Sequence, residues 1–131
     1  KADSLYNTPP VFAVYMACLV TRWLKKEGGV AEMDRRARER SSLIYDVIDK
    51  SSGFYINRIA PEARSRMNVV FHLAEDALTD LFVKEAADAG LVNLKGHRLA
   101  GGIRASMYNA LPMEGAVALA NFMKVFAARH G

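Results

Sequence analysis

The sequence is poor in the residues that build disulfides and metal centres. It contains one cysteine, Cys18, and only three histidines, which lie far apart at His72, His97 and His130. One cysteine cannot form a disulfide within the chain, and in its apolar surroundings Cys18 is expected to act as a small hydrophobic residue. A structural zinc ion takes four Cys, His or carboxylate ligands, usually at short spacings. No such set is visible, so we expect no metal.

Long hydrophobic runs and known phosphate-binding loops are also missing. The longest uncharged run of the first helical segment, Val11 to Thr21, is shorter than the roughly 20 apolar residues that a membrane span needs. The "GGVAEM" stretch lacks the Lys-Ser/Thr ending of a Walker loop. No signal peptide is recognised after Lys1. We therefore expect no membrane partner and a cytoplasmic location.

The excess of positive charge is small. The chain has 18 Lys and Arg against 14 Asp and Glu, a net charge of +4. Its longest charged run, "DRRARER" at residues 34–40, mixes both signs at helical spacing, which is typical of a solvated helix face. A nucleic-acid-binding domain would instead gather basic residues and aromatics on one surface. We expect no nucleic-acid partner.

Helix signals recur along the chain. "YNTPPVF" predicts a helix start, with Thr8 as the N-cap and two prolines in the first turn. This helix should run to about Glu27 and, being apolar almost all round, should be buried on most sides. A second helix is expected from about Val30 to residues 51–53, with a stripe made of Met33, Ala37, Ile44, Val47 and Ile48. Two more are expected over residues 76–89, where Gly90 is the stop, and over residues 109–130.

Four segments between the helices have strand character. Alternation of apolar and polar residues is clearest in "SRMNVVFHLA" and in "GIRASMY". The predicted strands cover residues 54–59, 65–74, 91–94 and 102–108. The order α-α-β-β-α-β-β-α predicts an α+β fold, a small mostly antiparallel sheet covered by helices on one side. By size, residues 1–131 form one domain.

The stretch "KGHRLAGGIRAS", residues 95–106, interleaves cations with glycines. Glycines let a backbone turn sharply and approach a ligand closely, and Arg98 and Arg104 could each hold a carboxylate or phosphate through two hydrogen bonds. The alternative is a solvated turn between strands. Arg104 favours the anion site, because the strand pattern places it on a face with the small residues Gly102 and Ser106, where an anion has room.

Asn7 and Thr8 form a second candidate anion site. They precede a helix N-terminus, which carries partial positive charge and free amides. Because two prolines without amide hydrogens follow, the side chains of Asn7 and Thr8 become the natural donors. The alternative is simple helix capping.

Several segments together resemble one enzyme family. "LYNTPP", "RSRMNVVFHLA", "KGHRLAGGIRASMYNA" and the terminal "RHG" are similar to the C-terminal part of the bacterial phosphoserine aminotransferase family. The resemblance implies the C-terminal small domain of a fold-type I enzyme that uses pyridoxal 5'-phosphate. The family converts 3-phosphohydroxypyruvate and glutamate into phosphoserine and 2-oxoglutarate in serine biosynthesis. In many bacteria it also acts in the branch leading to vitamin B6.

The same resemblance assigns roles to the candidate residues. It implies that His97 and Arg98 hold the substrate phosphate and that Arg104 binds the α-carboxylate. It also implies that Asn7 and Thr8 reach the cofactor phosphate of the neighbouring subunit, so that the enzyme is a homodimer. Residues 1–28 are then expected to be an interdomain or dimer helix segment of this C-terminal domain.

The family's catalytic lysine has no counterpart in this sequence. None of the seven lysines lies in a sequence context that matches the family's catalytic lysine; they are Lys1, Lys25, Lys26, Lys50, Lys84, Lys95 and Lys124. The resemblance places that lysine upstream, in a large cofactor-binding domain. We therefore expect a fragment without catalytic residues, inactive alone because a transaminase needs the lysine to move a proton. The alternative is a stand-alone binding module for a phosphorylated small acid.

Overall fold

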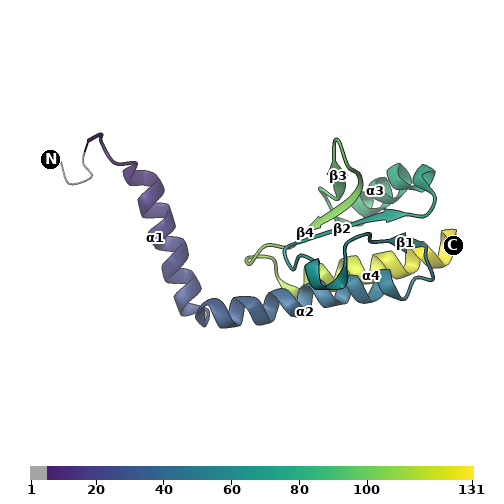
Figure 1. Ribbon diagram of the computed structural model, residues 1–131, viewed down its shortest axis with the longest axis horizontal. Helices are drawn as coiled ribbons and strands as arrows, with labels where there is room; N and C mark the ends of the chain where they lie inside the picture. Colours follow the sequence, from purple (N-terminus) through teal and green to yellow (C-terminus); the bar gives the residue numbers. More distant parts are fainter. Residues whose placement is uncertain (1–5) are drawn as a thin grey trace. The chain divides into compact units, whose positions relative to one another are not determined.

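The computed structural model describes residues 6–131, which form two compact units. The first ends at Asp34 and the second comprises Arg35–Gly131 (Figure 1). No helix among the described residues is long and apolar enough to cross a bilayer.

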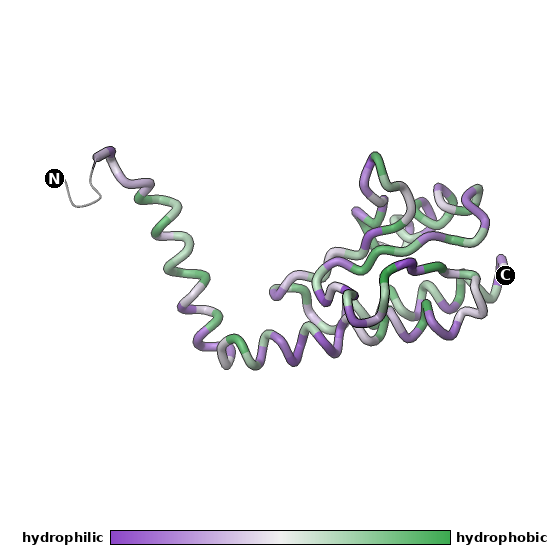
Figure 2. The backbone as a smooth tube through the Cα atoms, viewed as in Figure 1, coloured by the Kyte–Doolittle hydropathy of each residue, from purple (hydrophilic) through white to green (hydrophobic). Residues whose placement is uncertain are grey.

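Helix α1, Val11–Lys26, is the main element of the first unit. Its N-cap is Pro10 and no side chain caps it, so the predicted N-cap role of Thr8 is wrong. The predicted burial is also wrong for the described chain. None of the residues of α1 is buried, and Phe12 is 76% exposed. Figure 2 shows hydrophobic residues recurring along the whole helix. A helix cannot bury an all-round apolar surface without partners, so this surface is available for another chain segment.

Helix α2, Gly29–Asp49, confirms the second predicted helix. Gly28 and Gly29 both have positive φ values, of 105° and 74°, which explains why α1 ends before them. All members of the predicted stripe are buried, namely Met33, Ala37, Ile44, Val47 and Ile48.

Arg40 departs from the prediction of a solvated charged run. Its side chain is only 2% exposed, and Nη1 donates a hydrogen bond to the Leu111 carbonyl oxygen at 2.9 Å. Burial and the nearby Arg36 lower the pKa of the Arg40 guanidinium. Arg40 lies within the apolar stripe, three residues after Ala37 and four before Ile44, so the stripe carries it toward the Leu111 carbonyl; the mixed-charge pattern alone did not indicate this.

The sheet has four antiparallel strands in the order β1-β2-β4-β3. The strands are β1 Tyr55–Ile56, β2 Asn68–Leu73, β3 Lys95–His97 and β4 Gly101–Ser106. The predicted alternation is confirmed on the two central strands: Val69, Phe71 and Leu73 of β2 are buried, as are Ile103 and Ala105 of β4. The sheet therefore has one core face and one outer face.

The helices of the second unit cover the core face. Helix α3, Thr79–Asp88, follows the short 3-10 turn Asp76–Leu78, and helix α4, Met113–His130, packs beside α2 (Figure 1). Edge-to-face aromatic contacts join the layers, from Tyr55 and Phe71 of the sheet through Phe82 of α3 to Phe126 of α4. The fold is α+β, as predicted.

One predicted strand is absent. Residues 91–94, "LVNL", are not a strand, because Asn93 adopts a positive φ of 62° that extended backbone does not allow. Pairing begins at Lys95, one residue beyond the predicted segment. Gly90, by contrast, has a φ of 82° and ends α3 as predicted.

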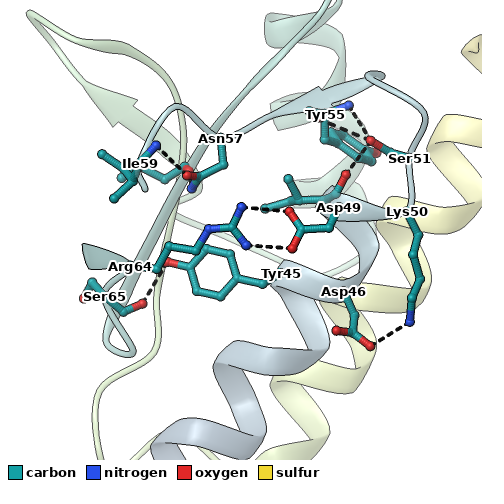
Figure 3. A network of polar contacts seen from close by, with 12 residues as sticks. Tyr45, Asp46, Asp49, Lys50, Ser51, Tyr55, Asn57, Ile59, Arg64 and Ser65 are labelled. Carbon is teal, nitrogen blue, oxygen red and sulfur yellow. Dashed lines mark hydrogen bonds and ion pairs between the residues drawn. The ribbon is translucent and has the colours of Figure 1, made fainter. Parts of the chain in front are cut away.

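A polar network attaches the loop after β1 to α2 (Figure 3). Arg64, which follows the 3-10 turn Pro61–Ala63, donates two hydrogen bonds of 2.7 and 2.8 Å to the Asp49 carboxylate. Its guanidinium lies 4.7 Å from the centre of the Tyr45 ring, and the Tyr45 hydroxyl donates to the Ser65 carbonyl oxygen. The pair lowers the pKa of Asp49 and raises that of Arg64. The network fixes the segment that leads into β2.

Candidate functional site

The β3–β4 hairpin carries three of the five predicted site residues. His97 pairs with Gly101, and the Ala100 amide donates to the His97 carbonyl oxygen at 3.0 Å, closing a tight turn around Arg98 and Leu99. Gly101 has a φ of 66°, which an L side chain rarely adopts. The glycine-rich motif therefore builds a turn that presents His97 and Arg98 at its end.

Two other glycines of the motif are required by close contacts. A Cβ atom at Gly96 would lie 1.9 Å from the Gly101 carbonyl oxygen, on the facing strand. A Cβ at Gly102 would lie 2.8 Å from Nδ1 of His72, whose ring packs against this glycine. The glycines thus bring the hairpin strands and the neighbouring β2 side chain into contact.

A backbone hydrogen bond orients the His97 ring. The Leu99 amide donates to Nδ1 at 3.2 Å, so the neutral ring carries its hydrogen on Nε2. His97 is exposed, and among the described residues no group bonds to Nε2, which can donate to an anion. The turn therefore offers an imidazole donor on the residue that precedes Arg98.

Arg104 lies on the outer face of β4, opposite Val70 of β2, as the strand pattern predicted. Within residues 6–131 neither Arg98 nor Arg104 makes a side-chain hydrogen bond or ion pair. Arg104 and Ser106 also border a pocket of about 400 Å³ whose other walls come mostly from residues 90–94 and α4. The hairpin thus has two guanidinium groups without counter-charges.

The structure brings the three hairpin residues into one element but separates them along it. Strands advance about 3.4 Å per residue, so the three steps from Gly101, the partner of His97, to Arg104 cover about 10 Å. Arginine side chains can shorten this span. By the strand register His97 lies on the face of Gly101 and Ile103, whereas Arg104 lies on the outer face.

Asn7 and Thr8 lie in the first unit, four and three residues before α1 begins at Val11. Both are exposed, and neither side chain makes a hydrogen bond within the described residues. Simple capping, the alternative reading, does not account for them, because the cap position is Pro10. Their amide and hydroxyl donors remain available to an anion.

The sequence pattern missed a polar cluster on the outer face of the sheet. The Asn68 side-chain oxygen accepts hydrogen bonds from the Ser106 hydroxyl at 3.0 Å and the Tyr108 hydroxyl at 3.5 Å. Alternation along β2 and β4 indicates the face of Asn68 and Ser106, but their adjacency depends on the strand register. No group of three or more His, Cys, Asp or Glu residues suited to a metal occurs in residues 6–131.

Comparison with known proteins gives one consistent result. The model of the aminotransferase class-V family matches residues 1–119. The phosphoserine aminotransferases of Shouchella clausii (strain KSM-K16) and Laribacter hongkongensis (strain HLHK9) are 52% and 55% identical over 130 residues. These matches cover 99% of this chain and 36% of each relative, so the chain spans about a third of their length.

Solved structures agree with the sequence comparison. Phosphoserine aminotransferase from Bacillus circulans subsp. alkalophilus superposes with a TM-score of 0.92 at 46% identity, over 99% of this chain and 36% of that one. A pyridoxal-phosphate-bound phosphoserine aminotransferase from Trichomonas vaginalis superposes with a TM-score of 0.83 at 42% identity, over 92% of this chain and 34% of that one.

Proposed function

The chain belongs to the aminotransferase class-V family, and on that premise we propose that it is the C-terminal domain of a phosphoserine aminotransferase. The full-length enzyme, in which an N-terminal part like that of the relatives precedes this chain, would transfer the amino group of glutamate to 3-phosphohydroxypyruvate. Phosphoserine and 2-oxoglutarate are the products. We place this activity in the cytoplasm and in serine biosynthesis.

The observation that carries the proposal is the hairpin, whose two guanidinium groups have no side-chain partner within residues 6–131. His97 and Arg98 at the turn are the donors for the substrate phosphate, since an imidazole N–H and a guanidinium together match its oxygens. Arg104, further along β4, takes the α-carboxylate that every substrate of the reaction carries. His97 and Arg98 thereby select the phosphorylated substrate, and Arg104 orients every substrate.

The cofactor of the proposed enzyme is pyridoxal 5'-phosphate. Asn7 and Thr8 fit its phosphate group, because both side chains are exposed donors that do not cap α1. When bound, the cofactor supplies the electron sink for the carbanion at the substrate α-carbon. The residues of this chain bind and orient anionic groups, and the proton-transfer lysine belongs to the N-terminal part.

A homodimer is part of the proposal. The exposed apolar surface of α1 supports it, since Phe12, Val14 and Tyr15 are each more than half exposed in this chain. A surface of this kind marks an interaction site. Residues 1–28 would then form an interdomain or dimer segment, and Asn7 and Thr8 would act on the cofactor of the neighbouring subunit.

The test is a steady-state assay of the purified full-length enzyme. We expect glutamate-dependent amination of 3-phosphohydroxypyruvate and a much lower kcat/KM with unphosphorylated hydroxypyruvate. Equal use of the two keto acids, or no activity with either, would overturn the proposal. Calorimetric titration of phosphoserine into the 131-residue chain addresses the alternative, because only a stand-alone binding module would bind it as tightly as the full-length protein does.

A further inference from the structure

The outer face of the sheet places an amide group beside Arg104. In the β2–β4 register Val70 lies opposite Arg104 and Asn68 lies opposite Ser106. Asn68 is therefore the diagonal neighbour of Arg104 on the same face, at a distance of about 7 Å between Cβ atoms. An arginine side chain readily covers that distance.

The orientation of the Asn68 amide is set by two hydroxyl groups. Ser106 Oγ donates to Asn68 Oδ1 at 3.0 Å, and Tyr108 Oη lies 3.5 Å from the same oxygen. An amide carries two donors on its nitrogen and none on its oxygen, so this arrangement uses the acceptor side of the group. Nδ2 makes no hydrogen bond within the described residues, and Asn68 is partly exposed.

We propose that Asn68 is a second carboxylate-binding residue, which donates from Nδ2 to the α-carboxylate held by Arg104. Ser106 and Tyr108 act as positioning residues, because they hold the amide with its N–H groups toward the substrate. This inference rests on the proposed function of Arg104. It assigns to the carboxylate site residues from β2 and β4, together with Tyr108 just after β4.

The chemistry of a carboxylate accommodates this additional donor. Two oxygens offer about four lone-pair positions, and a bidentate guanidinium occupies two of them. A neutral amide adds a hydrogen bond without adding charge, so it sharpens orientation around the α-carbon. Because every substrate carries the α-carboxylate, Asn68 should affect all of them alike, whereas His97 and Arg98 should affect only the phosphorylated ones.

The test uses the full-length enzyme with its cofactor and measures binding as well as rate. Glutarate, a dicarboxylate without an amino group, is titrated calorimetrically, and KM is determined for glutamate and phosphoserine. In Asn68→Ala we expect glutarate binding to weaken about 10-fold or more, the scale of one hydrogen bond to a charged group. Asn68→Asp keeps the size and the acceptor oxygen but adds a negative charge, and should weaken binding further. Inorganic phosphate should bind as in the wild type.

Controls separate this inference from general damage and from the proposed function. Asn121→Asp makes the same chemical change at an exposed position on α4 and should leave glutarate binding unchanged. If Arg104→Gln weakens glutarate binding and Asn68→Ala does not, the inference on Asn68 is wrong and the proposed function stands. If Arg104→Gln has no effect either, the proposed carboxylate site is wrong. Equal weakening of glutarate and phosphate in Asn68→Ala would indicate lost structure and overturn the assignment.

Discussion

Replacing Arg98 by alanine should separate the two substrates of the proposed enzyme. Arg98 lies in the turn closed by the hydrogen bond from the Ala100 amide to the His97 carbonyl oxygen, and its φ is negative. Alanine adopts such a conformation without strain. The side chain has no partner among the described residues, so its removal should leave the hairpin intact.

The expected size follows from the bond that is lost. A hydrogen bond to a charged group contributes about 1.5–3 kcal/mol, which corresponds to a loss of roughly 10- to 150-fold in kcat/KM for 3-phosphohydroxypyruvate and phosphoserine. We expect the lower half of this range, because Arg98 is exposed in the hairpin and solvent screens the interaction. The kcat/KM for glutamate, which has no phosphate, should change less than about 3-fold.

A coupled steady-state assay at constant ionic strength measures both substrates in the same preparation. Lys95→Ala is the matched control, because it removes a positive charge from the same hairpin but from a side chain that pairs with Asp80 at 3.3 Å. Arg98→Lys keeps the charge without the two-point geometry and should show an intermediate loss. Equal losses for glutamate and the phosphorylated substrates, or an equally large effect of Lys95→Ala, would refute the assignment of Arg98.

Four further predictions concern the cofactor, the dimer and stability. The 131-residue chain alone should form no covalent adduct with pyridoxal phosphate after borohydride reduction, and a mass increase by one cofactor would contradict this. Two inactive full-length variants can be mixed, one without the catalytic lysine and the other with Asn7→Ala and Thr8→Ala. If subunits share their sites, each mixed dimer should regain activity in up to about half of its sites. No recovery under conditions that exchange subunits would exclude shared sites. Asp49→Asn should lower the free energy of unfolding by at most about 1 kcal/mol, since Asp49 is half exposed. Because Arg64 lowers the folded pKa of Asp49, this stabilisation is complete above about pH 4 and lost as pH falls through the folded pKa, so the wild type and the variant should converge in acid denaturation. Tyr55→Phe should cost about 1 kcal/mol in urea unfolding, because its buried hydroxyl donates to a carbonyl oxygen of α4 at 2.8 Å, and an unchanged midpoint would contradict that.

Local chemistry in the sequence predicted the order of the helices and several of their ends. Pro112 precedes α4 and Gly90 follows α3, because proline lacks an amide hydrogen and glycine tolerates a positive φ. Alternation predicted the buried face of β2 and the outward position of Arg104, because successive side chains of a strand point to opposite faces. The candidate anion-binding residues came from composition and from the family resemblance.

Two features of the fold became visible only in the three-dimensional structure. The sequence pattern predicted a strand at residues 91–94, but the left-handed conformation of Asn93 moves the start of pairing to Lys95. It predicted a solvated Arg40, but the loop at Leu111 covers that side chain and accepts its hydrogen bond. Periodicity reports only which face of an element a residue occupies. It does not report what another part of the chain places against that face.

The polar cluster on the outer face of the sheet also depends on both the sequence and the tertiary structure. From the sequence, Asn68 and Ser106 are each an outward residue of a separate strand, 38 positions apart. Only the β2–β4 register makes them partners and places the amide of Asn68 beside Arg104. A shift of one residue in that register would move Asn68 to the other face relative to Arg104, since the side-chain period of a strand is two. The types of side chain available for anion binding were therefore determined by the sequence, and their assembly into one surface by the pairing of distant strands.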